Sequence, residues 1–211
     1  MGVPVVLVAR KFHGRPLNSV VVDNVGGAYT AVNHLIGLGH TRIGIINGPY
    51  FLSTGIERWE GARKALEENG IPYDDGLVRE GDFGMKGGYE GTVGLLRLVT
   101  PPTALFTANH MMAAGALLAL REAGMRVPED MALVSFDGFD DLDINFLIKP
   151  SITANIHPTA KMGSTAVNLL LQMIREKTEG ISSPGVVQEI RLSMEFVIRE
   201  SSGNPITGPK K

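Results

Sequence analysis

The sequence predicts an α/β protein with a mainly parallel β-sheet and helices on both of its faces. Short β-branched runs alternate with amphipathic stretches of helical length through most of the chain, which is the pattern of repeated β-α-β units. Apolar residues make up 44% and charged residues 20% of the 211 positions, so the chain can bury a sizeable core. Glycine is enriched, with 26 residues and no G-x-y period, so we expect glycines at turns and helix ends.

The predicted elements follow one another in a regular order up to about residue 136. We expect strands over residues 5–8, 19–22, 42–46, 77–79, 103–107 and 131–136, and helices over residues 24–37, 54–69, 87–98 and 111–123. Apolar spacing of three to four residues indicates the helices, and short apolar runs indicate the strands. In the second helix, Thr54-x-x-Glu57 predicts a capping box at the start, and Gly70 predicts the end.

The alternation breaks after residue 136. Residues 150–156 are expected to form a crossing segment, and Pro158 at a helix start predicts a long helix through about Lys177. Residues 186–198 alternate imperfectly, which is typical of a closing strand or a hairpin. The end of the chain, 203–211, has two prolines, two glycines and two terminal lysines, and it is predicted to be a disordered tail.

Composition and motifs argue against several kinds of function. Lys and Arg number 20 and Asp and Glu 22, a formal net charge of −2 that argues against a polyanion as the main partner. The chain has no cysteine, so it has no disulfide framework, which weakly favours a reducing compartment. It contains no G-x-S-x-G, P-loop or H-E-x-x-H motif, and its five histidines lack metal-ligand spacing. We therefore predict no catalytic residues, no metal and no cofactor.

No segment is expected to enter a membrane. The first apolar run lacks the preceding basic stretch of a signal peptide. The most apolar later segment, 111–120, is shorter than the ~20 residues that a membrane span requires. The sequence therefore predicts a soluble protein.

Polar side chains follow several of the predicted strands at the point where each strand ends. In open α/β sheets, ligands bind beyond the carboxyl ends of the strands, so these residues are candidates for a site. The candidates at the strand ends are Asn47, Asp82, Phe83, Asn109 and Asp137, and Arg58 lies on the helix over 54–69. Carboxylate, amide and guanidinium groups beside an aromatic face can bind sugar hydroxyls or the edge of a heterocycle.

Each candidate also has a purely structural interpretation. Asn109 is well placed to cap the helix over 111–123, and both roles stay open. Asp137 can shape the turn into Gly138, Phe83 can belong to the core, and an arginine such as Arg58 is often a solvated surface charge. The binding interpretation gains weight because all of these residues would converge on one edge of the sheet.

Seven segments carry a resemblance to a known family. They are VVVDNVGGAY (20–29), HLIGLGHTRIGIINGP (34–49), ERWEGARKAL (57–66), EGDF (80–83), PTALFTAN (102–109), GMRVPEDMALVSFD (124–137) and RESS (199–202). Together they resemble the lactose-repressor (LacI-type) transcriptional regulators from about Val3 to Ser202.

The resemblance implies a periplasmic-binding-protein-like type I effector domain, in which two α/β lobes joined by crossing strands close on a small ligand. Arg58, Asn109 and Asp137 match positions that contact the effector in this family. Thr54 and Phe83 match positions that touch it in some members, and His157 matches a polar position near the crossing. Two residues depart from the family pattern: Ala9 and His110 each stand where an aspartate is usual.

The resemblance also implies a domain organisation with one nearly complete lobe and part of a second. The helix-turn-helix headpiece and the first elements of the first lobe are expected to lie outside these 211 residues. We expect a remnant of the first lobe over 1–23, the second lobe over 24–153, a return to the first lobe over 154–184, a closing segment of the second lobe over 185–202 and the tail over 203–211.

These observations predict the effector-binding and dimerisation part of a LacI-type regulator in the cytoplasm, binding a sugar or a related polar metabolite. Operator DNA would be contacted only through the headpiece. The apolar segment 111–120 fits a homodimer interface, although a buried helix explains it equally well. The alternative is a transport-type sugar-binding protein of the same fold, and an α/β enzyme is a third possibility that the missing catalytic motifs disfavour.

Overall fold

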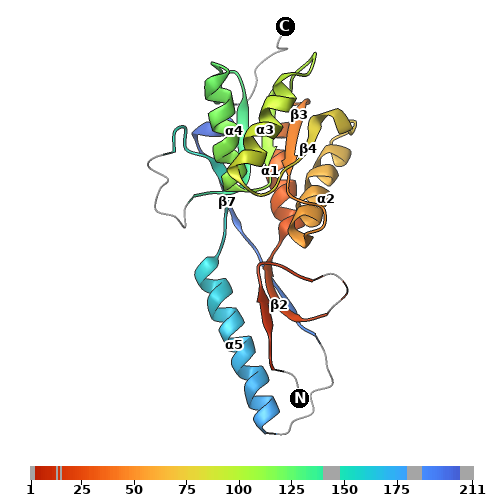
Figure 1. Cartoon of the computed structure of the whole chain (residues 1–211), viewed down its shortest axis with the longest axis vertical. Helices are drawn as coiled ribbons and strands as arrows, with labels where there is room; N and C mark the ends of the chain where they lie inside the picture. The colour runs from red at the N-terminus through yellow and green to blue at the C-terminus, as the bar shows by residue number, and fades with distance from the viewer. Residues whose placement is uncertain (1–2, 13, 15, 140–147, 180–186, 205–211) are drawn as a thin grey trace. The chain divides into compact units, whose positions relative to one another are not determined.

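The chain folds into two units, and each unit has its own β-sheet (Figure 1). The computed structural model describes residues 3–12, 14, 16–139, 148–179 and 187–204. Unit 1 comprises residues 1–23 and 157–194, and unit 2 comprises residues 24–156 and 195–211. The predicted tail over 203–211 lies outside the described residues from position 205 onward.

Unit 2 is built on a six-stranded sheet in the order β4-β3-β5-β6-β7-β9. The strands are β3 (Ile43–Asn47), β4 (Val78–Glu80), β5 (Ala104–Thr107), β6 (Ala132–Asp137), β7 (Thr153–Ile156) and β9 (Glu195–Val197). The first five are parallel, and β9 runs antiparallel to β7. Every residue of β3 and β5 is buried, as expected for a parallel sheet covered on both faces. The predicted fold class is confirmed.

Two pairs of helices cover the two faces of this sheet. The helices are α1 (Asn24–Gly37), α2 (Ser53–Glu68), α3 (Met85–Leu96) and α4 (His110–Glu122), with a short 3₁₀ helix, η1 (Asp75–Leu77), before β4. α1 packs against α2, and α3 packs against α4. The side chain of Ile46 contacts α3 at Gly91, whereas Ile45 lies beside Leu66 of α2. Because neighbouring strand residues point to opposite faces, the two helix pairs lie on opposite sides of the sheet.

Unit 1 is a three-stranded parallel sheet with one long helix. The strands are β1 (Val6–Val8), β2 (Asn18–Val22) and β8 (Glu189–Leu192), in the order β1-β2-β8. The helix α5 (Thr159–Thr178) packs on β1 and β2. A last 3₁₀ helix, η4 (Glu200–Ser202), belongs to unit 2 and packs against β6.

The second half of the chain differs from the sequence expectation in two places. The segment 150–156, expected to cross, provides the parallel strand β7 of unit 2. The segment 186–198 does not form a hairpin within its described part, because β8 pairs with β2 in unit 1 and β9 pairs with β7 in unit 2. The closing segment expected over 185–202 is therefore divided between the two units.

The predicted capping box at the start of α2 is wrong. The residue that precedes the helix is Leu52, which has no side-chain cap, and Thr54 lies inside the first turn. Glu57 instead accepts a hydrogen bond from Nδ2 of Asn24 at 2.8 Å, which takes it away from the helix start. The predicted end of the helix is confirmed, because Gly70 has a φ of +67° and Ile71 N donates to Leu66 O.

Glycines allow α3 and α4 to approach each other closely. A Cβ at Gly88 of α3 would overlap the carbonyl oxygen of Met112, and a Cβ at Gly115 of α4 would overlap that of Met85. Such backbone contacts cannot yield as a flexible side chain can, so the spacing of the helices depends on these glycines.

No helix of the described part of the chain is long and apolar enough to cross a membrane.

We expect Gly115→Ala to lower the free energy of unfolding by about 1–3 kcal/mol, because the added methyl group overpacks the contact between α3 and α4. Urea unfolding followed by circular dichroism measures the change. Gly37→Ala in α1 is the matched control, since a Cβ at Gly37 has no neighbour within 4 Å. Equal unfolding midpoints for the two variants would contradict the proposed role of Gly115.

Candidate functional site

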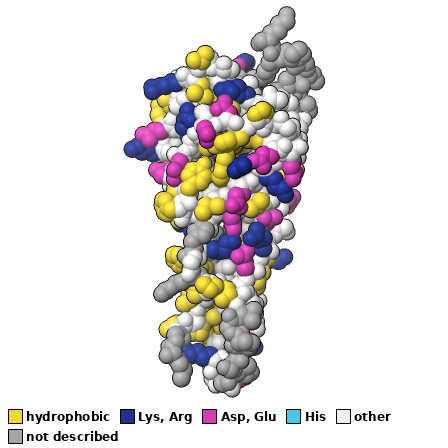
Figure 2. All heavy atoms as spheres, turned by 90° about the vertical axis from the view of Figure 1, so that its right-hand side faces the viewer, with side chains coloured by type: hydrophobic (Ala, Val, Ile, Leu, Met, Phe, Trp, Pro, Cys, Tyr) yellow, Lys and Arg dark blue, Asp and Glu magenta, His cyan; other side chains and the backbone are white. Residues whose placement is uncertain are grey.

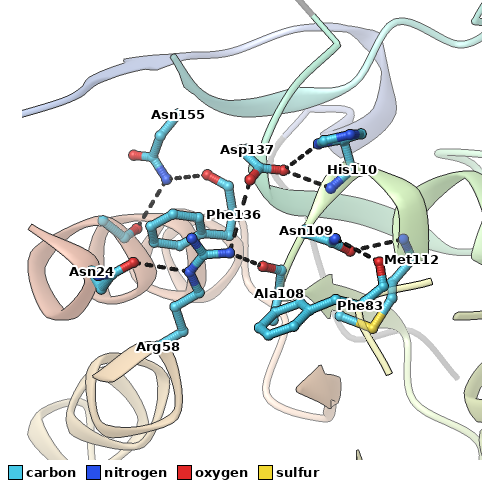
Figure 3. A network of polar contacts seen from close by, with 11 residues as sticks. Asn24, Arg58, Phe83, Ala108, Asn109, His110, Met112, Phe136, Asp137 and Asn155 are labelled. Atoms are coloured by element: carbon cyan, nitrogen blue, oxygen red, sulfur yellow. Dashed lines mark hydrogen bonds and ion pairs between the residues drawn. The ribbon is translucent and has the colours of Figure 1, made fainter. Parts of the chain in front are cut away.

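Three of the candidate residues, Phe83, Asn109 and Asp137, gather around the guanidinium group of Arg58 at one edge of the sheet of unit 2 (Figure 3). Asn47 ends β3, Asn109 follows β5, and Asp137 ends β6. Arg58 extends from α2 toward the same edge, where its neighbours come from α1, the end of β5 and β6. The ends of these strands lie close together, as the sequence predicts.

Arg58 is buried, with 6% of its surface exposed, so it is not the solvated charge of the structural interpretation. Its Nε donates to Oδ1 of Asn24 at 3.0 Å, and its Nη1 donates to the carbonyl oxygen of Ala108 at 2.5 Å. The guanidinium carbon lies 3.6 Å from the centroid of the Phe136 ring. A buried guanidinium is tolerated only when its hydrogen bonds and charge are compensated, and this stacked arrangement provides part of that compensation.

Asp137 supplies the opposite charge. Its Oδ2 lies 3.8 Å from Nη1 of Arg58, and both side chains are largely buried. Its Oδ1 accepts hydrogen bonds from the backbone N–H of His110 at 2.6 Å and from Nδ1 of His110 at 2.9 Å. Asp137 therefore joins the end of β6 to the first residue of α4 and faces the Arg58 cation at the same time.

Asn109 has the structural role that the sequence allowed. It is the N-cap of α4, and its Oδ1 accepts a hydrogen bond from Met112 N at 2.9 Å. Its Nδ2 donates to the carbonyl oxygen of Phe83 at 2.8 Å. One amide thus ties the start of α4 to the loop after β4, which places Asn109 beside the Arg58 network.

Phe83 is held in an unusual backbone conformation. Its φ is +61°, in the left-handed region that non-glycine residues rarely occupy, which costs of order 1–3 kcal/mol. The hydrogen bond from Asn109 holds the carbonyl group of Phe83. A Cβ at position 48 would overlap the Phe83 ring, so the ring fits only because residue 48 is a glycine. The ring centroid is 5.7 Å from the Arg58 guanidinium carbon, and the ring also packs against the buried core.

Asn47 and Asp82 have mainly local roles. The buried Asn47 donates from Nδ2 to the carbonyl oxygens of Gly48 and Gly55, which ties the end of β3 to the start of α2. Oδ1 of Asp82 accepts from the N–H groups of Gly84 and Gly87, so it shapes the turn into α3.

The two remaining predicted site residues, Thr54 and His157, belong to different units. Thr54 is buried in the first turn of α2, and no described residue forms a hydrogen bond with its Oγ1. His157 belongs to unit 1, just before α5.

Three members of the network were not singled out by the sequence. Asn24 holds Nε of Arg58, Phe136 stacks on its guanidinium, and Asn155 donates from Nδ2 to the carbonyl oxygen of Phe136 at 2.7 Å. The only available signal was position, because Phe136 and Asn155 lie on predicted strand or crossing segments and Asn24 starts a predicted helix. A sequence pattern does not reveal which buried side chain receives a distant arginine.

The network contains groups that can bind a polar ligand. It offers a cationic fork, a carboxylate, amides and two aromatic rings, which can hold hydroxyls or ring nitrogens. In the described ranges, no group of three or more His, Asp or Glu side chains is placed to hold a metal ion.

Comparison with known proteins identifies the family. The periplasmic binding protein-like domain model matches residues 32–202. The chain is similar to the HTH-type transcriptional repressor PurR of Haemophilus influenzae (strain PittEE), with 39% identity over 190 residues that cover 89% of this chain and 55% of that protein. The chain spans about half the length of the curated relatives that it matches.

Solved structures agree. A complex of the transcriptional regulator CelR with cellobiose has 33% identity and a TM-score of 0.82, and the match covers 93% of this chain and 58% of that one. A LacI family transcriptional regulator from Enterococcus faecium with bound ribose has 30% identity and a TM-score of 0.82. This match covers 97% of this chain and 72% of that one. The chain therefore belongs to the LacI family of transcriptional regulators and carries the family's periplasmic binding protein-like domain.

Proposed function

We propose that this chain is the effector-binding part of a LacI-type regulator and that a sugar or a related small polar metabolite binds beside Arg58 in unit 2. The observation that carries the proposal is the buried pair of Arg58 and Asp137 at the carboxyl ends of the strands. Burying two charges costs more than packing apolar groups in the same space, so such a pair is poor evidence of a purely stabilising role. Its place at the ligand-binding edge of an open sheet favours a binding role.

The ligand class follows from the groups that surround Arg58. A guanidinium and a carboxylate make paired hydrogen bonds with vicinal hydroxyls or with the edge of a heterocycle, and Phe83 and Phe136 provide aromatic faces. We assign ligand contacts to Arg58, Asn109, Asp137 and Phe83, with Thr54 and His157 as further contacts. Two similar proteins of known structure hold sugars, cellobiose in one and ribose in the other, which supports the same class for this chain.

The output of binding would be a change in DNA affinity. The curated relatives are named as HTH-type transcriptional regulators, and the chain matches about half of their length. We propose that the whole protein binds operator DNA through a part that corresponds to the other half of these relatives. Acidic and basic side chains are interspersed on the face seen in Figure 2, as expected for a net charge of −2, and no basic stripe is visible there. An effector that favours one arrangement of the protein would shift the population toward it. This role would place the protein in the cytoplasm.

We also propose that α4 contributes to a homodimer interface. One side of α4 is buried in unit 2, while the other side remains apolar and partly exposed. Burial within unit 2 therefore explains the apolar residues on only one side of the helix. That side lines a groove of about 350 Å³ formed by Met85, Ala114, Leu117, Leu118, Arg121, Met125, Val127, Ile148, Lys149 and Pro150. A largely apolar groove of this kind is typical of a surface that a second copy covers.

Arg58→Ala is expected to weaken effector binding about 5- to 150-fold, which corresponds to about 1–3 kcal/mol for lost buried polar contacts. Isothermal titration calorimetry with D-ribose, cellobiose and guanine measures the affinity. Arg63→Ala is the matched control, because Arg63 lies on the same helix and pairs with Glu67 in solvent. If a bound compound keeps its wild-type affinity in folded Arg58→Ala, the assignment of Arg58 to the site is wrong.

Leu118→Glu is expected to raise the dissociation constant of the dimer by roughly tenfold or more, since an unpaired carboxylate would be buried in the groove. Sedimentation velocity over a range of protein concentrations measures this constant. Val99→Glu is the control, because Val99 is fully exposed and lies outside the groove. A dimer that is equally stable in both variants would place the interface elsewhere.

A further inference from the structure

His110 occupies a defined position at the rim of the Arg58 network. It is the first residue of α4, directly after the N-cap Asn109, and it comes next to the polar end of β6. Its ring meets the ring of Phe139 edge to face, with centroids 5.2 Å apart, and its side chain is 27% exposed. The bond to Asp137 therefore orients the imidazole (Figure 3), and the side chain remains partly exposed.

The bond to Asp137 determines which nitrogen of His110 carries the proton. An ionised carboxylate oxygen can only accept, so Nδ1 of His110 donates to Oδ1 of Asp137 across 2.9 Å. In a neutral imidazole the other nitrogen, Nε2, is then an acceptor. Within the described ranges, no residue forms a hydrogen bond with Nε2 of His110.

The same bonds occupy much of the Asp137 carboxylate. Oδ1 already accepts two hydrogen bonds from His110, one from the backbone and one from the ring, and Oδ2 faces the Arg58 guanidinium at 3.8 Å. Capping alone accounts for the backbone bond, because Asn109 and Asp137 together satisfy N–H groups in the first turn of α4. It does not account for the bond between Nδ1 of the ring and Asp137, which fixes the orientation of a side chain that is partly exposed.

We propose that His110 is a direct ligand contact that determines specificity, and that Asp137, besides its own proposed ligand contact, positions the ring of His110. This inference rests on the proposed function and names a further residue of the same site. Nε2 of His110 would accept a hydrogen bond from a hydroxyl or a ring N–H of the ligand. The site then combines a hydrogen-bond donor, Arg58, with an acceptor, Nε2 of His110. A ligand that presents only acceptors to His110, such as a carboxylate edge, would be disfavoured.

The test combines calorimetry with nitrogen-15 NMR of the histidine rings. D-Ribose, cellobiose and guanine are titrated into the wild-type protein and into His110→Phe, which keeps an aromatic ring and the backbone bond to Asp137. We expect about a tenfold loss of affinity in His110→Phe, as for a hydrogen bond of about 1.4 kcal/mol, with little change in the unfolding temperature.

The NMR signals separate a contact from a structural effect. In the wild type, we expect the Nδ1–H form of His110 and a shift of its Nε2 signal when a compound binds. His34 is the internal reference, because burial lowers the pKa of its imidazole and its Nε2 bonds Ser202 at 3.0 Å, so its signals should not move. In Asp137→Ala the Nδ1–H form is expected to lose its preference, which would identify Asp137 as the positioning residue.

Each result has a separate meaning. If a compound binds but His110→Phe keeps full affinity, or the Nε2 signal does not move, the proposal for His110 is overturned and the proposed function stands. If the wild type binds a compound and shows the Nε2–H form, Asp137 does not position the ring and the proposal is also overturned. If neither protein binds any of the three compounds, the proposed function itself is contradicted for these ligand classes.

Discussion

The buried charge of Arg58 is the constraint on which the rest of unit 2 depends. A guanidinium cannot lose its proton in a protein, so it must be neutralised and hydrogen-bonded wherever the fold buries it. Asn24, the carbonyl group of Ala108, the Phe136 ring and the Asp137 carboxylate each meet part of this requirement. Because these groups come from three elements and Arg58 itself from a fourth, the network aligns α1, α2, the end of β5 and β6 at one edge of the sheet.

Strain and close packing accompany this network. Phe83 adopts a left-handed conformation beside Gly48, and glycines at the contact of α3 with α4 let the backbones approach. Features that cost stability are tolerated where the surrounding contacts hold them, and they often mark sites at which geometry matters more than stability. In unit 2 the strained residue and the buried ion pair lie at the same strand ends.

The sequence predicted the alternation of strands and helices and the convergence of the strand ends, and it allowed the cap at Asn109 as one of two roles, because each depends on local spacing or on a general rule of parallel sheets. It did not predict the burial of Arg58, since the partners of this side chain are distant along the chain. The capping box failed because Glu57 is taken by Asn24. The division of 186–198 between two sheets was not predictable either, as a short strand does not encode which edge it joins.

The order of β7 and β9 has a consequence for folding. These strands are neighbours in the sheet of unit 2, yet residues 157–194 of unit 1 lie between them in the sequence. Pairing across so long a loop is slow compared with local pairing, so the edge strand of unit 2 joins late. During synthesis, residues up to Val197 must emerge from the ribosome before this sheet can be completed, and until then β7 is an open edge.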